Sequence, residues 1–351
     1  MKLLPGVSNR TLTTQRLSVN ILEREADQGK SFSDENTIIF VHGNVSSSQF
    51  WMELFPLFPE TIRPIAIDLR GFGGTESLPV DASRGVSDYS DDVHAALQVL
   101  GIEKPHLVGW SLGGGVVMQY ALDYPTASLT LQAPVSPYGF GGTDAAGKIL
   151  TADAAGTGAG GANPDFIARL ANGDTSADEQ TSPRSVFRNA YVSPGYQTVH
   201  EDIWVESMLS TVTGEGNYPG NLIPSENWPG FAAGTTGNLN TLAPGNFNVS
   251  GIVRLEKKPP ILWIRGDLDA IVGNASYFDI NFLGQVGIIP GWPGEEIAPA
   301  QPMLDQTRKV LEDYQERGGS YREVIFVGAG HSPHLEDPER FVQEVRAHTQ
   351  Q

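Results

Sequence analysis

The sequence predicts an α/β protein with a mostly parallel central sheet that carries helices on both of its faces. Short apolar runs rich in Val, Ile and Leu alternate along the chain with stretches of helical periodicity. Strands that alternate with helices form parallel sheets that are buried on both faces. The alternation stops near residue 134 and resumes near residue 259. We therefore expect residues 1–134 and 259–351 to form one core, interrupted by an insertion at residues 135–258.

Each element of this core follows from a local pattern. Residues 17–23 alternate in polarity and predict an early antiparallel strand, whereas continuous apolar runs predict buried strands. Amphipathic stretches with a period of 3.6 residues predict the helices between them. The buried strands are expected at residues 37–41, 62–68, 105–108, 128–132, 260–265 and 321–327, and the helices at residues 50–58, 88–100 and 113–122.

The insertion differs from the core in composition, because it is rich in Gly, Ala, Pro, Thr and Asn. It also carries many aromatic residues, which are rare in solvated linkers, so we expect a folded cap, or lid, domain. Trp204 and Met208 lie four residues apart on one face of an expected helix, which makes them candidates for the wall of a substrate pocket. The short helical patterns in the insertion are residues 164–171, 185–190 and 200–211.

A Gly-x-Ser-x-Gly motif occupies residues 109–113, between a predicted strand and a predicted helix. In this context the motif forces the serine into a strained, exposed turn that presents its hydroxyl as a nucleophile. The flanking glycines allow the strand and the helix to approach closely where a Cβ would clash. Ser111 is therefore the candidate nucleophile, and its neighbour Trp110 is a candidate substrate contact.

Two later loops supply a candidate acid and a candidate base. Asp269 and His331 each lie in a loop just after a predicted buried strand, and glycines surround His331. A serine hydroxyl needs a neutral imidazole to remove its proton, and a carboxylate can orient that imidazole. Asp267 is the alternative acid and His334 is the alternative base.

With these motifs in place, the chain resembles the α/β-hydrolase fold superfamily, the large group with Ser-His-Asp triads, whose members follow one another along the chain in the order Ser, Asp, His. Three more segments carry the resemblance: Val-His-Gly-Asn at residues 41–44, Asp-Leu-Arg-Gly-Phe-Gly-Gly-Thr at residues 68–75, and the segment from Gly330-His331 to Phe341. The resemblance implies the α/β-hydrolase fold over most of the chain, but residues 135–258 match nothing in it.

The resemblance also implies roles for individual residues. The family places its acid three residues after a glycine, which favours Asp269 over Asp267. It builds its oxyanion hole from two backbone N–H groups, which correspond here to Asn44 and Leu112. The expected function is therefore hydrolysis of a carboxylic ester or lactone through an acyl-enzyme, by Ser111, His331 and Asp269.

The same triad also serves carbon–carbon bond and amide hydrolases, and the same fold serves non-catalytic ligand receptors. These are the alternative functions. The aromatic residues of the insertion favour a substrate with a hydrophobic, bulky acyl or alcohol group. A further excursion at residues 284–301 is expected near the mouth of the pocket.

Composition sets limits on partners and location. The chain has 351 residues, a formal net charge of −18 and no cysteine, so disulfides and thiolate sites are excluded. An acidic surface repels nucleic acids and anionic lipid headgroups, so we expect neither as a partner. No His or carboxylate cluster has metal-ligand spacing, and the expected chemistry uses no cofactor. With no transmembrane run or signal-like start, the expected location is cytoplasmic.

Overall fold

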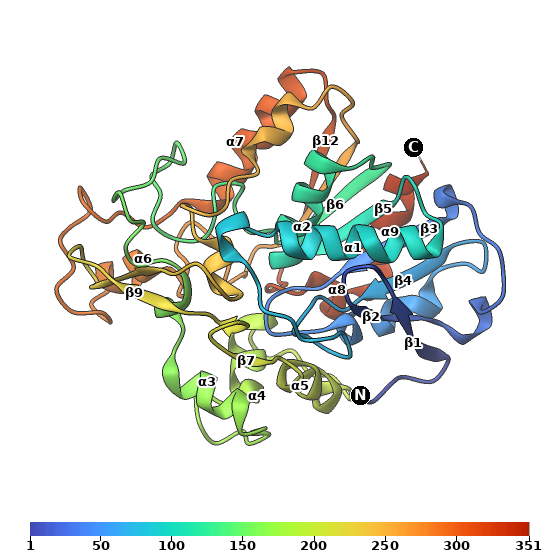
Figure 1. The fold of residues 1–351 in the computed structure, drawn as a ribbon, viewed down its shortest axis with the longest axis horizontal. Helices are drawn as coiled ribbons and strands as arrows, with labels where there is room; N and C mark the ends of the chain where they lie inside the picture. The colour runs from blue at the N-terminus through green and yellow to red at the C-terminus, as the bar shows by residue number, and fades with distance from the viewer. Residues whose placement is uncertain (351) are drawn as a thin grey trace.

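One eight-stranded sheet, in the order β1-β2-β4-β3-β5-β6-β11-β12, runs through the centre of the computed structural model, which describes residues 1–350 (Figure 1). β2 pairs antiparallel with β1 and β4, and every other neighbouring pair is parallel. This confirms the predicted fold class. The strands of the sheet are β1 (Val7–Thr13), β2 (Ser18–Arg24), β3 (Thr37–Val41), β4 (Arg63–Ile67), β5 (His106–Trp110), β6 (Ser128–Gln132), β11 (Ile261–Gly266) and β12 (Tyr321–Phe326).

Helices cover both faces of the sheet. The α-helices are α1 (Ser87–Leu100), α2 (Leu112–Asp123), α3 (Pro164–Ala171), α4 (Pro183–Val186), α5 (Glu201–Leu209), α6 (Ile280–Gln285), α7 (Met303–Glu316), α8 (Pro333–Glu336) and α9 (Pro338–Thr349). A ten-residue 3₁₀ helix, η3, spans Ser48–Leu57. None of the helices within residues 1–350 is long and apolar enough to cross a membrane.

Two hydrophobic clusters hold the layers together, because successive side chains of a strand point to opposite faces. On β3, Ile39 and Val41 join the cluster formed with α1, α2 and α7, whereas Ile38 and Phe40 join the cluster formed with η3 and α9. All five residues of β3 are buried. This double burial explains why the strand is a continuous apolar run.

The structure differs from the predicted core elements in several places, and it adds α6 and α7, for which no helix was predicted. β1 was not expected, because its residues 8–11 are exposed or half-buried polar side chains that give no strand pattern. The stretch expected as an ordinary helix at residues 50–58 is the 3₁₀ helix η3, which contains Pro56. Proline lacks the N–H that an α-helix needs, and this favours the tighter and less regular form.

The chain leaves the sheet after β6 and returns to it at β11, the neighbouring strand. Between them lie α3, α4, α5, a π-helix (Phe187–Tyr191) and the short strands β7 (Thr213–Gly214), β8 (Tyr218–Pro219), β9 (Leu222–Pro224) and β10 (Phe231–Ala233). In Figure 1, β9 lies beside α6 at the left, and α3, α4, α5 and β7 lie together at the bottom of the view. The last part packs into the core, where Phe247, Val249 and Ile252 join the cluster of α1 and α2.

The parallel register brings the ends of the central strands into line. Val41 at the end of β3 pairs with Gly109 of β5, which pairs in turn with Leu131 of β6. The loops that follow these strands therefore emerge at one edge of the sheet, where ligands bind in open α/β folds.

Close backbone contact at this edge depends on glycine. A Cβ on Gly109 would lie 2.3 Å from the carbonyl oxygen of Gly113, and a Cβ on Gly113 would lie 2.3 Å from that of Val41. We expect Gly109→Ala to lower the free energy of unfolding by about 1–3 kcal/mol, because the backbone must move apart. Denaturant titration measures this change.

Gly245→Ala is the matched control. Gly245 is exposed, and a Cβ there would have no atom within 4 Å. Its effect should stay within about 0.5 kcal/mol. Equal effects of the two substitutions would contradict the close approach of β5 and α2.

Candidate active site

Ser111 occupies the turn between β5 and α2 in a conformation that L-residues rarely adopt, with φ 55° and ψ −115°. Backbone hydrogen bonds hold this turn from both sides. The Ser111 N–H donates to Gln132 O at 3.0 Å, and Ser111 O accepts from Gly114 N at 3.0 Å and from Val135 N at 3.1 Å. A strained residue persists only where its surroundings fix it in this way.

His331 and Asp269 contact each other directly. His331 Nδ1 lies 2.8 Å from Asp269 Oδ2, and both side chains are almost completely buried. The other oxygen, Oδ1, accepts from the N–H groups of Ile271 at 2.8 Å and Val272 at 3.0 Å. The carboxylate partner places the proton on Nδ1, so His331 Nε2 is left as an acceptor.

The pairing of the two loops depends on adjacent parallel strands. Asp269 follows β11 and His331 follows β12, which is its parallel neighbour. A Cβ on Gly266, at the end of β11, would lie 2.1 Å from the carbonyl oxygen of Gly330. Glycine at residue 266 therefore lets the acid loop and the histidine loop touch.

The alternative acid and base lie elsewhere. Asp267 is exposed, and its Oδ1 accepts from Gly328 N at 2.6 Å. His334 is fully buried, with Nδ1 2.7 Å from Gln132 Nε2 and its ring 4.4 Å from that of Trp51. Burial lowers the pKa of His334 well below its ordinary value. The structure therefore brings Asp269, and not Asp267, to an imidazole.

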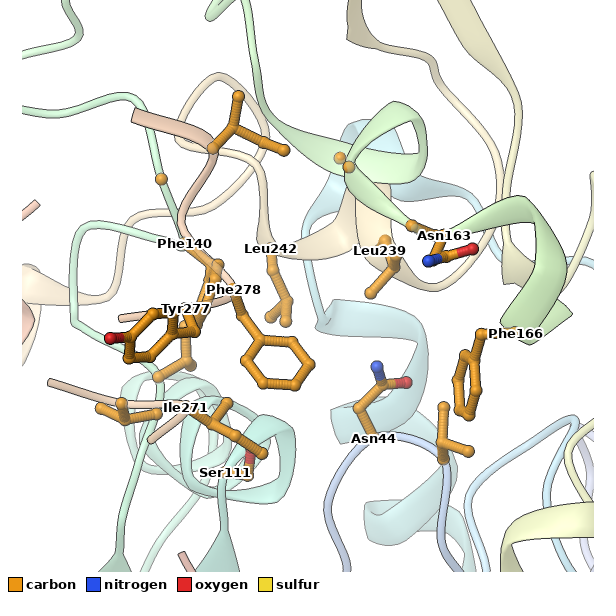
Figure 2. A pocket seen from close by; sticks show the side chains of 18 of the residues that line it. Asn44, Ser111, Phe140, Asn163, Phe166, Leu239, Leu242, Ile271, Tyr277 and Phe278 are labelled. Atoms are coloured by element: carbon orange, nitrogen blue, oxygen red, sulfur yellow. The ribbon is translucent and has the colours of Figure 1, made fainter. Parts of the chain in front are cut away.

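Ser111 and His331 open into one cavity of about 370 Å³. Figure 2 shows Ser111 and Ile271 below the cavity, with Tyr277 and Phe278 on one side and Asn44 and Phe166 on the other. Within residues 1–350, the lining contains no Asp, Glu, Lys or Arg. Its larger apolar and aromatic members are Val45, Trp110, Val135, Phe140, Phe166, Val186, Tyr191, Tyr218, Leu239, Leu242, Ile271, Val272, Tyr277, Phe278, Ile280 and Leu283.

The two expected oxyanion donors lie next to the serine. Leu112 follows it directly at the start of α2, and Asn44 follows Gly43, where a Cβ would lie 3.1 Å from Ser111 Cβ. Neither the Asn44 N–H nor the Leu112 N–H donates to a backbone carbonyl anywhere in residues 1–350. The assignment of both N–H groups to an oxyanion hole stays a prediction.

His42 holds the loop that carries Asn44. Its Nε2 accepts from the N–H of Leu69 at 3.0 Å, and its Nδ1 lies 2.7 Å from Gly43 O. These partners place the proton on Nδ1. Burial lowers the pKa of His42, although the nearby Asp68 acts in the opposite direction. A neutral imidazole therefore joins the loops that follow β3 and β4.

The three candidate substrate contacts have different positions. Trp110 lines the cavity, and its Nε1 donates to His331 O at 3.0 Å. Trp204 and Met208 do not line it, although the sequence suggested them as pocket wall. Both are fully buried on α5, and the ring of Phe50 lies between Trp204 and Trp110, at 5.3 Å and 5.2 Å. Helical spacing indicates a shared face but not what that face contacts.

Sequence reasoning missed most of the cavity wall. Phe140, Phe166, Tyr277 and Phe278 line it, from segments that are distant along the chain. The expected excursion at residues 284–301 contributes no lining residue, although its neighbour Leu283 lies in the wall. Tyr277 and Phe278 offered one signal, because they form an aromatic pair shortly after the candidate acid.

A parallel sheet with a strained serine turn at one edge, and a His-Asp pair in the loops beside it, defines an α/β-hydrolase architecture. The chain belongs to the alpha/beta hydrolase family, whose family model matches residues 38–344.

Curated relatives match only part of the chain. A 2-hydroxy-6-oxononadienedioate/2-hydroxy-6-oxononatrienedioate hydrolase from Comamonas testosteroni is 30% identical over 134 residues, which cover 36% of this chain and 43% of the relative. A dihydrolipoyllysine-residue acetyltransferase component of an acetoin cleaving system from Cupriavidus necator is 35% identical over 105 residues, 30% of this chain and 27% of the relative. The chain thus spans less than half of the length of these relatives.

Solved structures match almost the whole chain. The esterase RhEst1 from Rhodococcus sp. ECU1013 has a TM-score of 0.59 at 19% identity and covers 98% of both chains. The carboxylesterase CesB from Bacillus subtilis has a TM-score of 0.56 at 16% identity and covers 97% of this chain and 91% of its own. At such low identity, this similarity concerns the fold.

The geometry of the site predicts its reactivity toward a fluorophosphonate, which traps an activated serine. Ser111 should be the labelled residue, and His331→Ala should abolish labelling, because the base is lost. Asp269→Asn should slow labelling at least about a hundredfold, because the imidazole loses its orienting carboxylate. Intact mass and peptide mapping over time measure the rate.

Asp267→Asn is the matched control, since it is the same change two residues away on an exposed side chain. Its labelling rate should stay within about threefold of the wild type. A larger loss with Asp267→Asn than with Asp269→Asn would refute the assignment of the acid.

Proposed function

We propose that this chain is a serine hydrolase that cleaves an uncharged carboxylic ester or lactone through an acyl-enzyme intermediate. One observation carries the proposal. The strained serine and the carboxylate-bound imidazole face a single cavity whose wall is mainly apolar, with Asn163, Thr157 and Thr181 among its polar members, and carries no acidic or basic side chain other than that imidazole. A strongly apolar pocket with a few polar groups at one point is typical of a small-molecule site.

The proposed reaction begins with proton transfer from Ser111 Oγ to His331 Nε2 as the oxygen attacks the substrate carbonyl. Asp269 keeps the imidazole proton on Nδ1 and stabilises the imidazolium that forms. The N–H groups of Asn44 and Leu112 bind the negative charge that develops on the carbonyl oxygen.

The imidazolium of His331 then gives its proton to the departing alkoxide, which leaves an acyl group on Ser111. Water then attacks this acyl group while His331 Nε2 takes a proton from it, and the imidazolium returns that proton to Ser111 Oγ as the bond from Oγ to the acyl carbon breaks and the carboxylic acid leaves. Every proton transfer in this scheme uses groups of the chain itself.

The cavity wall supports an uncharged substrate. A carboxylate or an ammonium group that enters the cavity loses its hydration and finds no opposite charge among the lining residues. Such unpaired burial of an ion costs several kcal/mol. Aromatic and aliphatic side chains, in contrast, favour an apolar acyl or alcohol group.

This argument separates the proposed substrate from that of one relative. The Comamonas testosteroni hydrolase is named for a dioate, which carries two carboxylates. Cationic side chains make the strongest hydrogen bonds to carboxylates, and the cavity lining offers no Lys or Arg within residues 1–350. A neutral ester is therefore a better candidate for this cavity than a dioate.

Two esters with the same leaving group test the proposed substrate class. We expect p-nitrophenyl pentanoate to exceed p-nitrophenyl hydrogen glutarate in kcat/KM by at least about a hundredfold. This ratio corresponds to ~3 kcal/mol for burying one carboxylate. p-Nitrophenyl acetate should be turned over more slowly than p-nitrophenyl pentanoate, because its shorter acyl chain buries less apolar surface. Release of p-nitrophenol, corrected for spontaneous hydrolysis, gives kcat/KM for each ester.

Tyr277→Arg tests the same argument by adding a positive charge to the wall of the cavity. Tyr277 lines the cavity but is 59% exposed, so it can carry a charge at the mouth. The cation should reduce the preference for the neutral ester about tenfold. Equal turnover of both esters by the wild type would overturn the proposed substrate class, and absence of turnover and labelling would overturn the proposed hydrolysis.

A further inference from the structure

A tyrosine from the segment between β6 and β11 contacts the loop that carries Asn44. Tyr191 is the last residue of the π-helix, and its side chain is buried. Its hydroxyl donates to Asn44 O at 2.8 Å and lies 3.2 Å from Val45 O. Single π-helical turns occur often at functional sites.

The contacted loop is strained at Val45. This residue has φ 45°, a conformation that β-branched side chains avoid, and it is buried. Asn44 O belongs to the peptide before Val45, and Val45 O belongs to the peptide after it. One hydroxyl therefore contacts the peptide planes on both sides of the strained residue, which fixes both of its backbone dihedrals.

The strained turn follows directly on the N–H group that the mechanism needs. Asn44 carries the proposed oxyanion donor on its nitrogen and the Tyr191 contact on its carbonyl oxygen. On the other side, the imidazole of His42 and the hydroxyl of Ser46 both contact Gly43 O, at 2.7 Å and 2.9 Å. Asn44 is thus held from both neighbouring peptides.

The ring and the hydroxyl of Tyr191 have separable roles. The ring packs edge-on against Trp110 at 5.6 Å and lies 6.1 Å from Phe50, and this packing does not involve the hydroxyl. Burial raises the pKa of the Tyr191 phenol, so it remains a donor throughout any practical assay range. Tyr191→Phe removes the donor and keeps the ring.

We propose that Tyr191 is a positioning residue, whose hydroxyl clamps the strained Asn44–Val45 turn and so aims the Asn44 N–H at the developing oxyanion. The inference rests on the proposed ester hydrolysis. It also makes the site depend on the inserted segment, because the segment must be seated on the core before the oxyanion hole has its working geometry.

The test compares two tyrosines. Tyr191→Phe should lower kcat for p-nitrophenyl pentanoate about tenfold to a hundredfold and change KM less than about threefold, because the oxyanion contact is made mainly in the transition state. Tyr196→Phe is the control. Tyr196 comes from the same segment and donates to Leu335 O, also at 2.8 Å, but it does not line the cavity. Its kcat should remain unchanged, with a similar shift in Tm.

A double-mutant cycle examines the strain itself. Glycine adopts a positive φ without a Cβ clash, so Val45→Gly should remove most of the need for the clamp. We expect Tyr191→Phe to lower kcat less than about threefold in the Val45→Gly background. The same loss in both backgrounds would overturn the proposed clamp on Val45.

Other outcomes separate this inference from the function on which it rests. A wild type that hydrolyses esters, with Tyr191→Phe within threefold of it in kcat, would overturn the role of Tyr191 alone. Parallel losses of kcat and of Tm in Tyr191→Phe and Tyr196→Phe would also overturn the role of Tyr191, because they would indicate general destabilisation. A wild type that neither hydrolyses an ester nor reacts with a fluorophosphonate would overturn the proposed function and the clamp together.

Discussion

Three backbone segments meet at Gly109 and Gly113: the end of β3, the end of β5 and the start of α2. This contact determines the geometry of the candidate site. Gly113 at the start of α2 lies so close to the end of β3 that a Cβ would stand 2.3 Å from Val41 O. The same approach places Ser111 in a conformation that costs ~1–3 kcal/mol and sets the loop after β3 against it. The candidate nucleophile Ser111 and the nearby N–H of Asn44 thus share one packing constraint.

The parallel sheet explains how residues distant in sequence meet at this edge. Asp269 and His331 follow adjacent parallel strands, and Gly266 allows their loops to touch. A buried carboxylate normally costs free energy, but three hydrogen bonds to Asp269 offset this cost. Because the carboxylate is satisfied in the folded state, its position relative to the imidazole is fixed before any ligand arrives.

Local signals predicted the buried strands and the residues at their ends, but they missed β1 and α7. Residues 37–41 and 128–132 form the strands predicted from their apolar runs, and the structure brings Asp269 to His331 as the family resemblance implied. The wall of the cavity depends on long-range packing, which one sequence does not contain. Trp204, for example, has the expected helical spacing but is buried behind Phe50.

The distribution of charge in the molecule bears on how a substrate would be selected. The chain carries a formal net charge of −18, yet no Asp or Glu within residues 1–350 lines the cavity. Much of the acidic charge near α1 is paired, since Asp88 and Asp92 both contact Arg70. The overall field therefore repels anions at a distance, while loss of hydration opposes ions of either sign within the cavity. Under the proposed function, selection among neutral molecules depends on the shape and the mainly apolar character of the wall.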